Sequence, residues 1–236
     1  MSRKVIGIIG GMGPLATVDL YQKMVLHTAA ATDQEHPRVC IDSNTAIPDR
    51  TEALLHGGAD PTPELVSSAR RLQSIGAEVL IMPCNTAHCF FDAVAASVDI
   101  PLLHMIDLTR DALGRRGVKT AGLLATDGTV ETGIYQNAFA GSGIELLTPP
   151  PEDQAAVMDV AYKGVKAGDL GHDVSAFCRC CDNLLRRGAE TLILGCTELP
   201  PAMGLYRLEY PVTDPTLELA LAALRFAGCA VKEDVP

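Results

Sequence analysis

Short apolar runs alternate with longer amphipathic segments along most of this chain. In residues 63–75, apolar side chains recur at helical spacing on one face. Continuous apolar strands followed by helices are typical of parallel sheets covered on both sides, so the pattern predicts an α/β fold. Ligands in such folds bind beyond the carboxyl ends of the strands. The predicted strands are Val5–Ile9, Arg38–Asp42, Val79–Met82, Leu102–Met105, Ala121–Leu124, Ile144–Leu147, Thr191–Leu194 and Tyr210–Thr213.

Two stretches of the chain recur about 110 residues later. GAEVLIMPCNT (76–86) aligns without gaps with GAETLILGCTE (188–198), and KVIGIIGGMGPLAT (4–17) aligns with KTAGLLATDGTVET (119–132). Any two strand–turn–helix units share some likeness, but two matches at nearly equal offsets favour a duplicated unit. We therefore predict two pseudosymmetric domains, formed by residues 1–102 plus 212–236 and by residues 103–211. The helix predicted over 216–226 returns to the first domain.

Composition and charge exclude several classes of partner. The 236 residues carry 19 basic and 29 acidic side chains, a net charge of −10, which supplies no basic footprint for nucleic acid. No apolar run approaches the ~20 residues of a membrane span, and the short run Val5–Ile9 reads as a strand rather than a signal peptide. We expect a cytoplasmic protein with no nucleic-acid or membrane partner.

Two of the eight cysteines stand at equivalent positions of the repeat. Cys84 in IMPCNTAH and Cys196 in ILGCTELP each follow a predicted strand directly. Backbone N–H groups and a helix dipole at such a turn favour an anion, so we expect a thiol pKa lowered from about 8.5 toward neutrality. Such thiols are competent bases or nucleophiles. We expect a reducing compartment to keep the cysteines as thiols. The sequence contains no CxxC pair, so it predicts no metal site. The other six cysteines are interpreted as packing residues: Cys40, Cys89, Cys178, Cys180, Cys181 and Cys229.

Small polar residues follow both cysteines. Asn85 and Thr86 come after Cys84, and Thr197 and Glu198 come after Cys196. Their side chains and backbone N–H groups are suited to holding a small carboxylate. The alternative is ordinary N-capping of the next helix, which does not by itself require a cysteine before each cap.

Three basic residues are candidates for placing positive charge near these turns. Arg50, in the loop after the second strand, is suited to a bidentate clamp on a carboxylate. Lys166 ends a predicted helix in the second domain, and Lys163 competes with it by spacing. His88 lies one helical turn after Cys84, where it either orients the cysteine or is a satisfied histidine of the helix start.

The segment GGMGPLA (residues 10–16) also matches a GxGxxA dinucleotide fingerprint after a strand. Pro14 removes an N–H group that would face a pyrophosphate, and the expected acidic residue, Asp42, comes later than usual. We interpret the glycines instead as allowing close approach of a small ligand, with Met12 at the loop tip. A dinucleotide-dependent oxidoreductase is the alternative.

The motifs GGMGP, SNTAIPDRT, MPCNTAH, ATDGTVETGIYQ, VKAGD and LGCTEL occur in the order of the aspartate/glutamate racemase family, and the chain resembles its cofactor-independent aspartate racemases. The resemblance implies two duplicated α/β domains with the active site in the interdomain cleft, a homodimer, and no cofactor or metal. It implies that Cys84 and Cys196 are the catalytic pair. It implies that Asn85, Thr86 and Thr197 bind substrate, with Met12, Arg50 and Lys166 nearby. We add Thr126 and Glu198 to the predicted substrate-binding residues.

Two facing thiols suit the inversion of an α-carbon, because one removes a proton while the other delivers one. We predict a racemase that is independent of pyridoxal phosphate and acts on aspartate, with glutamate left open. A hydantoin racemase or a maleate isomerase would use the same cysteines. A non-catalytic amino-acid-binding protein is a further alternative, which the fold does not exclude.

Overall fold

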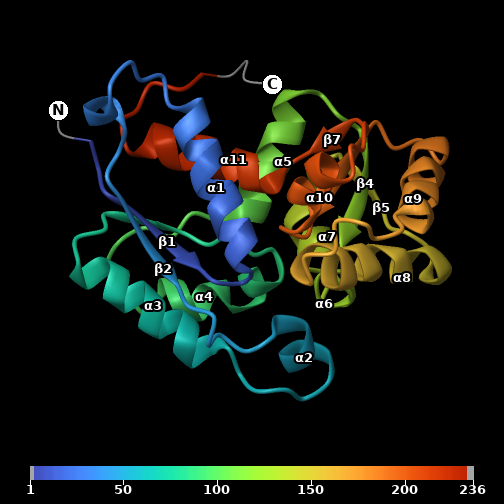
Figure 1. Ribbon diagram of the computed structural model, residues 1–236, viewed down its shortest axis with the longest axis horizontal. Coiled ribbons are helices and arrows are strands. Elements are labelled where there is room, and N and C mark those ends of the chain that lie inside the picture. Colours follow the sequence, from blue (N-terminus) through green and yellow to red (C-terminus); the bar gives the residue numbers. More distant parts are fainter. Residues whose placement is uncertain (1–2, 233–236) are drawn as a thin grey trace. The chain divides into compact units, whose positions relative to one another are not determined.

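The computed structural model describes residues 3–232 (Figure 1). The chain divides into two compact units. The first contains the residues up to Met105 together with those from Thr216 onward, and the second is Ile106–Pro215. The ends of the predicted first domain, residues 1–2 and 233–236, lie outside the described residues.

The first unit has a three-stranded parallel sheet in the order β2-β1-β3. Helices α1 and α11 lie on one side of this sheet and α3 and α4 on the other (Figure 1). The elements are β1 (Ile6–Gly10), α1 (Pro14–His27), η1 (Asp33–Glu35), β2 (Val39–Ser43), α2 (Arg50–Leu55), α3 (Thr62–Ser74), β3 (Val79–Ile81), η2 (Thr86–Phe90), α4 (Phe91–Ala95) and α11 (Pro215–Phe226).

The second unit has a four-stranded parallel sheet in the order β5-β4-β6-β7. Its strands alternate between two cores, one under α8–α10 and one under α5 and α7. The elements are α5 (Met105–Arg115), β4 (Thr120–Ala125), α6 (Asp127–Glu131), α7 (Ile134–Phe139), β5 (Glu145–Leu147), α8 (Pro151–Asp159), a π-helical segment η3 (Val160–Lys166), α9 (Ser175–Arg186), β6 (Thr191–Gly195), α10 (Leu199–Leu205) and β7 (Val212–Thr213).

The same hydrogen bonds recur in both units. Glu78 accepts a bond from the backbone N–H of Val5 at 2.8 Å, and Glu190 accepts one from the N–H of Thr120 at 3.0 Å. These are corresponding residues of the two sequence repeats. In each unit the acidic side chain therefore ties the start of the third strand to the start of the central strand.

Two glycines of the central strands are required for the same reason in both units. A Cβ at Gly7 would lie 2.6 Å from Leu80, and one at Gly122 would lie 2.8 Å from Leu192. A side chain at either position would overpack the strand against its neighbour. Shared strand order, shared contacts and shared glycines confirm the predicted duplicated α/β fold.

One predicted strand is wrong for most of its length. In the segment Leu102–Met105, only Leu102 forms a bridge, with Leu80, and Met105 already begins α5. The apolar pattern at the end of this segment reflects a buried helix start, because Met105 is fully buried. In the second unit the corresponding position is held by the two-residue strand β7, which pairs with β6.

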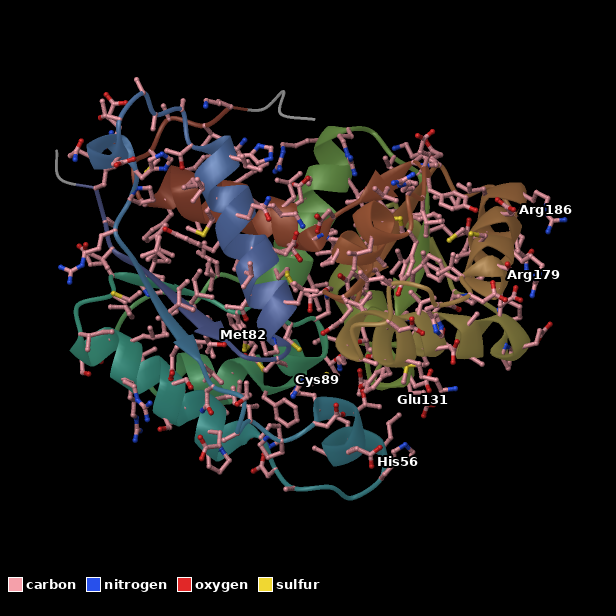
Figure 2. All side chains as sticks on the ribbon, viewed as in Figure 1. His56, Met82, Cys89, Glu131, Arg179 and Arg186 are labelled. Atoms are coloured by element: carbon pink, nitrogen blue, oxygen red, sulfur yellow. The ribbon has the colours of Figure 1, made fainter. Side chains whose placement is uncertain are left out.

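Two of the three cysteines of α9 pack in the core as predicted, whereas Cys178 is partly exposed. Cys180 and Cys181 are fully buried with Phe177, while Arg179 and Arg186 extend outward from the helix (Figure 2). Burial raises the pKa of Cys180 to about 12. None of the eight cysteines, all within the described part of the chain, forms a disulfide.

Candidate active site

Cys84 lies beyond the carboxyl end of β3, beside the central strand β1 of the first unit. The strand order reverses at this point, which is where open parallel sheets bind ligands. Its side chain is 5% exposed and belongs to the same buried cluster as Met12, from the loop after β1. The structure thus brings these two predicted site residues together. Met82 and Cys89, labelled in Figure 2, flank the turn along the chain.

His88 fixes the backbone of this turn. Its Nε2 accepts a hydrogen bond from the N–H of Met105 at 3.0 Å, so Nδ1 carries the proton and donates to the carbonyl of Cys84 at 2.8 Å. Burial, assisted by the nearby His104, lowers the pKa of His88 to about 3, which keeps the ring neutral. His88 is therefore a satisfied histidine that holds the Cys84 carbonyl, not a partner of the thiol.

Asn85 and Thr86 are buried immediately after Cys84. Asn85 occupies the N-cap position of η2, yet its side chain makes no capping bond to that helix. The same holds for Glu198 at the N-cap position of α10. Within the described residues, N-capping by these two side chains is therefore not the reason for their presence, which favours the ligand-binding interpretation.

Arg50 differs from the expected loop residue. It begins α2, is 8% exposed, and donates from Nη1 to the carbonyl of Pro48 at 2.9 Å. The preceding Asp49 caps this helix through the N–H groups of Thr51 and Glu52. The loop 44–50 therefore holds the guanidinium in a buried, fixed position.

The glycine loop after β1 is hydrogen-bonded to α1, the helix that follows it. The N–H of Gly11 donates to Thr17 Oγ1 at 2.9 Å, and Pro14, which has no N–H, begins α1. Gly11 has φ +92°, and a Cβ there would lie 2.4 Å from the backbone of Asn44. Asp42 lies 3.8 Å from Arg71 of α3. A pyrophosphate would find few donors in this loop, which counts against the dinucleotide alternative.

Cys196 occupies the corresponding position in the second unit, after β6. It is 5% exposed, and its Sγ donates to Glu198 Oε2 at 3.0 Å. Burial, together with the Glu198 carboxylate, raises the pKa of Cys196 well above its usual value. The expectation of a lowered pKa is wrong for Cys196, because burial of the thiol and the nearby carboxylate together outweigh the backbone N–H of the turn.

Lys166 is the lysine that acts on Cys196. Its positive charge opposes the rise in the Cys196 pKa, and its Nζ lies 3.8 Å from the ring centroid of Tyr162. Lys163 is instead exposed and pairs with Asp159 at 2.8 Å. Of the two lysines left open by spacing, the structure favours Lys166 as the one near the thiol. The π-helical geometry of η3 is often found at functional sites.

Thr126 and Thr197 are buried at the same sheet edge as Cys196. Ala125 and Gly195 are paired across β4 and β6, so Thr126 and Cys196 follow paired residues. The Thr126 hydroxyl lies 3.1 Å from that of Thr129 and caps α6. The structure thus gathers five predicted residues of the second unit, including Lys166 and Glu198, around one turn.

Sequence reasoning did not single out Tyr135 of α7. Its side chain is fully buried, and burial together with the charges of Asp214 and Cys196 raises its pKa. It is therefore a neutral phenol near the Cys196 thiol. The available signal was its place within the ATDGTVETGIYQ motif. Among the described residues, no cluster of His, Cys, Asp or Glu is arranged to hold a metal ion.

Comparison with known proteins identifies the family of this chain. The family model for Asp/Glu/hydantoin racemases matches residues 9–223. This chain belongs to the Asp/Glu/hydantoin racemase family. Within the family, the structure of Picrophilus torridus aspartate racemase is 34% identical, with a TM-score of 0.85 over 98% of this chain and 97% of that one.

Two further racemases are similar to this chain in sequence. The broad specificity amino-acid racemase RacX of Bacillus subtilis is 24% identical over 92% of this chain and 95% of its own length. A glutamate racemase of Methylococcus capsulatus is 30% identical over 58% of this chain, a match that spans 49% of that protein. The family prediction is confirmed. In the described part of this racemase-family chain, no helix is long and apolar enough to cross a membrane.

Proposed function

We propose that this protein interconverts L- and D-aspartate by two-base proton transfer, without pyridoxal phosphate. The observation that carries the proposal is the equivalence of Cys84 and Cys196, each placed after the third strand of a duplicated unit. Racemisation needs one proton carrier on each face of the α-carbon. We further propose residues 1–102 plus 212–236 and residues 103–211 as the two domains, each of which supplies one of the two thiols.

The proposed mechanism begins with one cysteine as a thiolate and the other as a thiol. The thiolate removes the α-proton, and the thiol protonates the opposite face of the resulting carbanion. The α-proton of an amino acid is very weakly acidic, so the developing negative charge needs stabilisation. Asn85, Thr86 and Thr197 are buried hydrogen-bonding residues next to the thiols, where low polarity strengthens such contacts.

Charge recognition in the proposal combines groups from both units. Arg50 and Lys166 are assigned to the two carboxylates of aspartate, with Met12 and Thr126 lining the site. Glu198 Oε1 is buried and has no hydrogen-bond partner among the described residues. A buried carboxylate oxygen is costly unless paired, so it suits the α-ammonium group of an amino acid.

Aspartate is proposed because Picrophilus torridus aspartate racemase is similar over nearly its whole length. The relatives also include glutamate and broad-specificity racemases. The decisive experiment incubates each L-amino acid with the protein in D₂O and reads enantiomer content together with α-deuteration. We expect D-aspartate with deuterium at the α-carbon. Inversion of glutamate or hydantoins, but not of aspartate, would reassign the substrate, and light scattering would test the predicted homodimer.

Activity is expected to survive exhaustive dialysis against chelator, with no absorbance band of pyridoxal phosphate. The reason is that the two thiols supply both proton carriers. The measurement is the racemisation rate before and after dialysis. A preparation that regains activity only when pyridoxal phosphate or a divalent metal is added would contradict the proposal.

Arg50→Lys is expected to raise the Michaelis constant for aspartate markedly. A lysine ammonium cannot reproduce the planar fork of a guanidinium on a carboxylate, nor its fixed bond to the Pro48 carbonyl. The matched control is Arg71→Lys, because Arg71 is exposed on α3. Initial rates over a range of aspartate concentrations measure both. An unchanged Michaelis constant in Arg50→Lys would remove this residue from the proposed site.

A further inference from the structure

The turns that hold the two cysteines differ at one chemically important position. Glu198 is 4% exposed and accepts a hydrogen bond from Cys196 Sγ at 3.0 Å. In the other copy, the register of the repeat places Thr86 where Glu198 stands. A hydroxyl therefore follows Cys84 at the position where a carboxylate follows Cys196.

Three ionisable side chains influence the Cys196 thiol from the elements around it. Glu198 lies at the start of α10, Lys166 ends η3, and Tyr135 belongs to α7. Burial and the Glu198 carboxylate raise the Cys196 pKa, whereas the Lys166 ammonium lowers it, and the upward effect is the larger. Tyr135 is a neutral phenol because its own pKa is raised. The net effect favours S–H over the thiolate.

We propose that Glu198 is a positioning residue that keeps the proton on Cys196 in the free enzyme, so that Cys196 starts as the proton donor and Cys84 as the thiolate. This inference rests on the proposed function, because it assigns different starting roles to the two cysteines of that mechanism. The repeat would otherwise leave them interchangeable. Glu198 acts through Cys196 and does not itself take the α-proton.

The proton and electron balance closes without another reactant. The Cys84 thiolate takes the α-proton, and the electron pair of the broken C–H bond stays on carbon. That pair then forms a new C–H bond with the proton of Cys196, and the S–H electron pair remains on sulfur. The new Cys196 thiolate lies beside the Glu198 carboxylate, and the like charges make it a strong base. It is therefore driven to regain a proton. Either water supplies that proton while Cys84 releases its own to water, or Cys196 takes the α-proton of the opposite enantiomer while Cys84 protonates the other face of the carbanion.

Site-resolved alkylation tests this inference. The protein is treated with iodoacetamide across a range of pH, and the labelling of Cys84 and Cys196 is followed by peptide mass spectrometry. Because only the thiolate reacts, the pH midpoint for each cysteine reports its deprotonation. In the wild type we expect the midpoint of Cys196 to lie above that of Cys84. Equal midpoints, or the reverse order, would overturn the inference without any variant.

The substitution Glu198→Gln removes the charge while keeping the shape of the side chain. We expect the Cys196 midpoint to fall by about one pH unit or more, and that of Cys84 to stay unchanged. The matched control is Glu131→Gln, an exposed residue at the end of α6 labelled in Figure 2. An unshifted Cys196 midpoint in Glu198→Gln would refute the role of the carboxylate. The readout needs no turnover, so failure of the proposed function would appear separately, as racemisation by a single Cys→Ser variant.

Discussion

Replacing either Cys84 or Cys196 by serine is expected to abolish racemisation in both directions. Serine is nearly isosteric with cysteine, but its hydroxyl is a far weaker acid than a thiol. Each positioned acid or base contributes about 10²–10⁴-fold to the rate, and inversion needs both. We expect each single variant to lose at least that factor. The measurement is the initial rate of D-aspartate formation from L-aspartate, and of the reverse reaction.

Partial reactions give this experiment its discriminating power. A variant that keeps one thiolate retains α-proton exchange only with the enantiomer whose proton faces that cysteine. Opposite enantiomer preferences in Cys84→Ser and Cys196→Ser would support thiols on opposite faces of the substrate. A near wild-type rate in either variant would make that cysteine structural and defeat the proposed mechanism.

The matched control for these variants is Cys178→Ser. Cys178 lies on α9, is partly exposed, and stands outside both cysteine turns. Its replacement should leave the racemisation rate unchanged. Circular dichroism of all three variants separates loss of chemistry from loss of fold. Cys→Ser at Cys84 or Cys196 removes little apolar area, so the folded content should be preserved.

Most of the fold could be predicted from the repeat in the sequence. Corresponding residues such as Glu78 and Glu190 make the same contact in both units, because a duplicated sheet needs the same ties at the same register. The segment Leu102–Met105 could not be assigned from pattern alone. An apolar run of four residues is equally consistent with a short strand and with a buried helix start.

The candidate site was predictable by position but not by electrostatics. Strand-end placement of Cys84 and Cys196 follows from the alternation of apolar runs and polar turns. The rise of the Cys196 pKa depends first on burial of the thiol and then on whether Glu198 bends back to the thiol or points to solvent. Sequence spacing does not determine the direction of the Glu198 side chain, which is set by burial and side-chain rotamers. The burial of Arg50 could not be predicted for the same reason, because the hydrogen-bond partners of its guanidinium are backbone carbonyls.

His88 is expected to make the protein sensitive to acid. Burial lowers its pKa in the folded state from 6.5 to about 3. Between these values the unfolded chain binds a proton that the folded protein excludes, so the free energy of unfolding falls as pH falls. The contribution is fully present above pH 6.5 and is lost progressively down to about pH 3. At about 1.4 kcal/mol per pH unit, the loss reaches about 5 kcal/mol at most.

Denaturant unfolding between pH 4.5 and pH 8 measures this loss, and His88→Gln isolates it. Glutamine does not titrate, so we expect a flatter dependence of unfolding free energy on pH below 6.5. At pH 8 the variant should be less stable by about 1–3 kcal/mol, because the Cys84 carbonyl and the Met105 N–H lose well-placed partners. The matched control is His56→Gln, since His56 is exposed at the end of α2 (Figure 2). If His88→Gln kept the wild-type dependence of unfolding free energy on pH, another group would be responsible for the acid sensitivity. The interpretation of His88 as a neutral residue that holds the Cys84 turn would then be wrong.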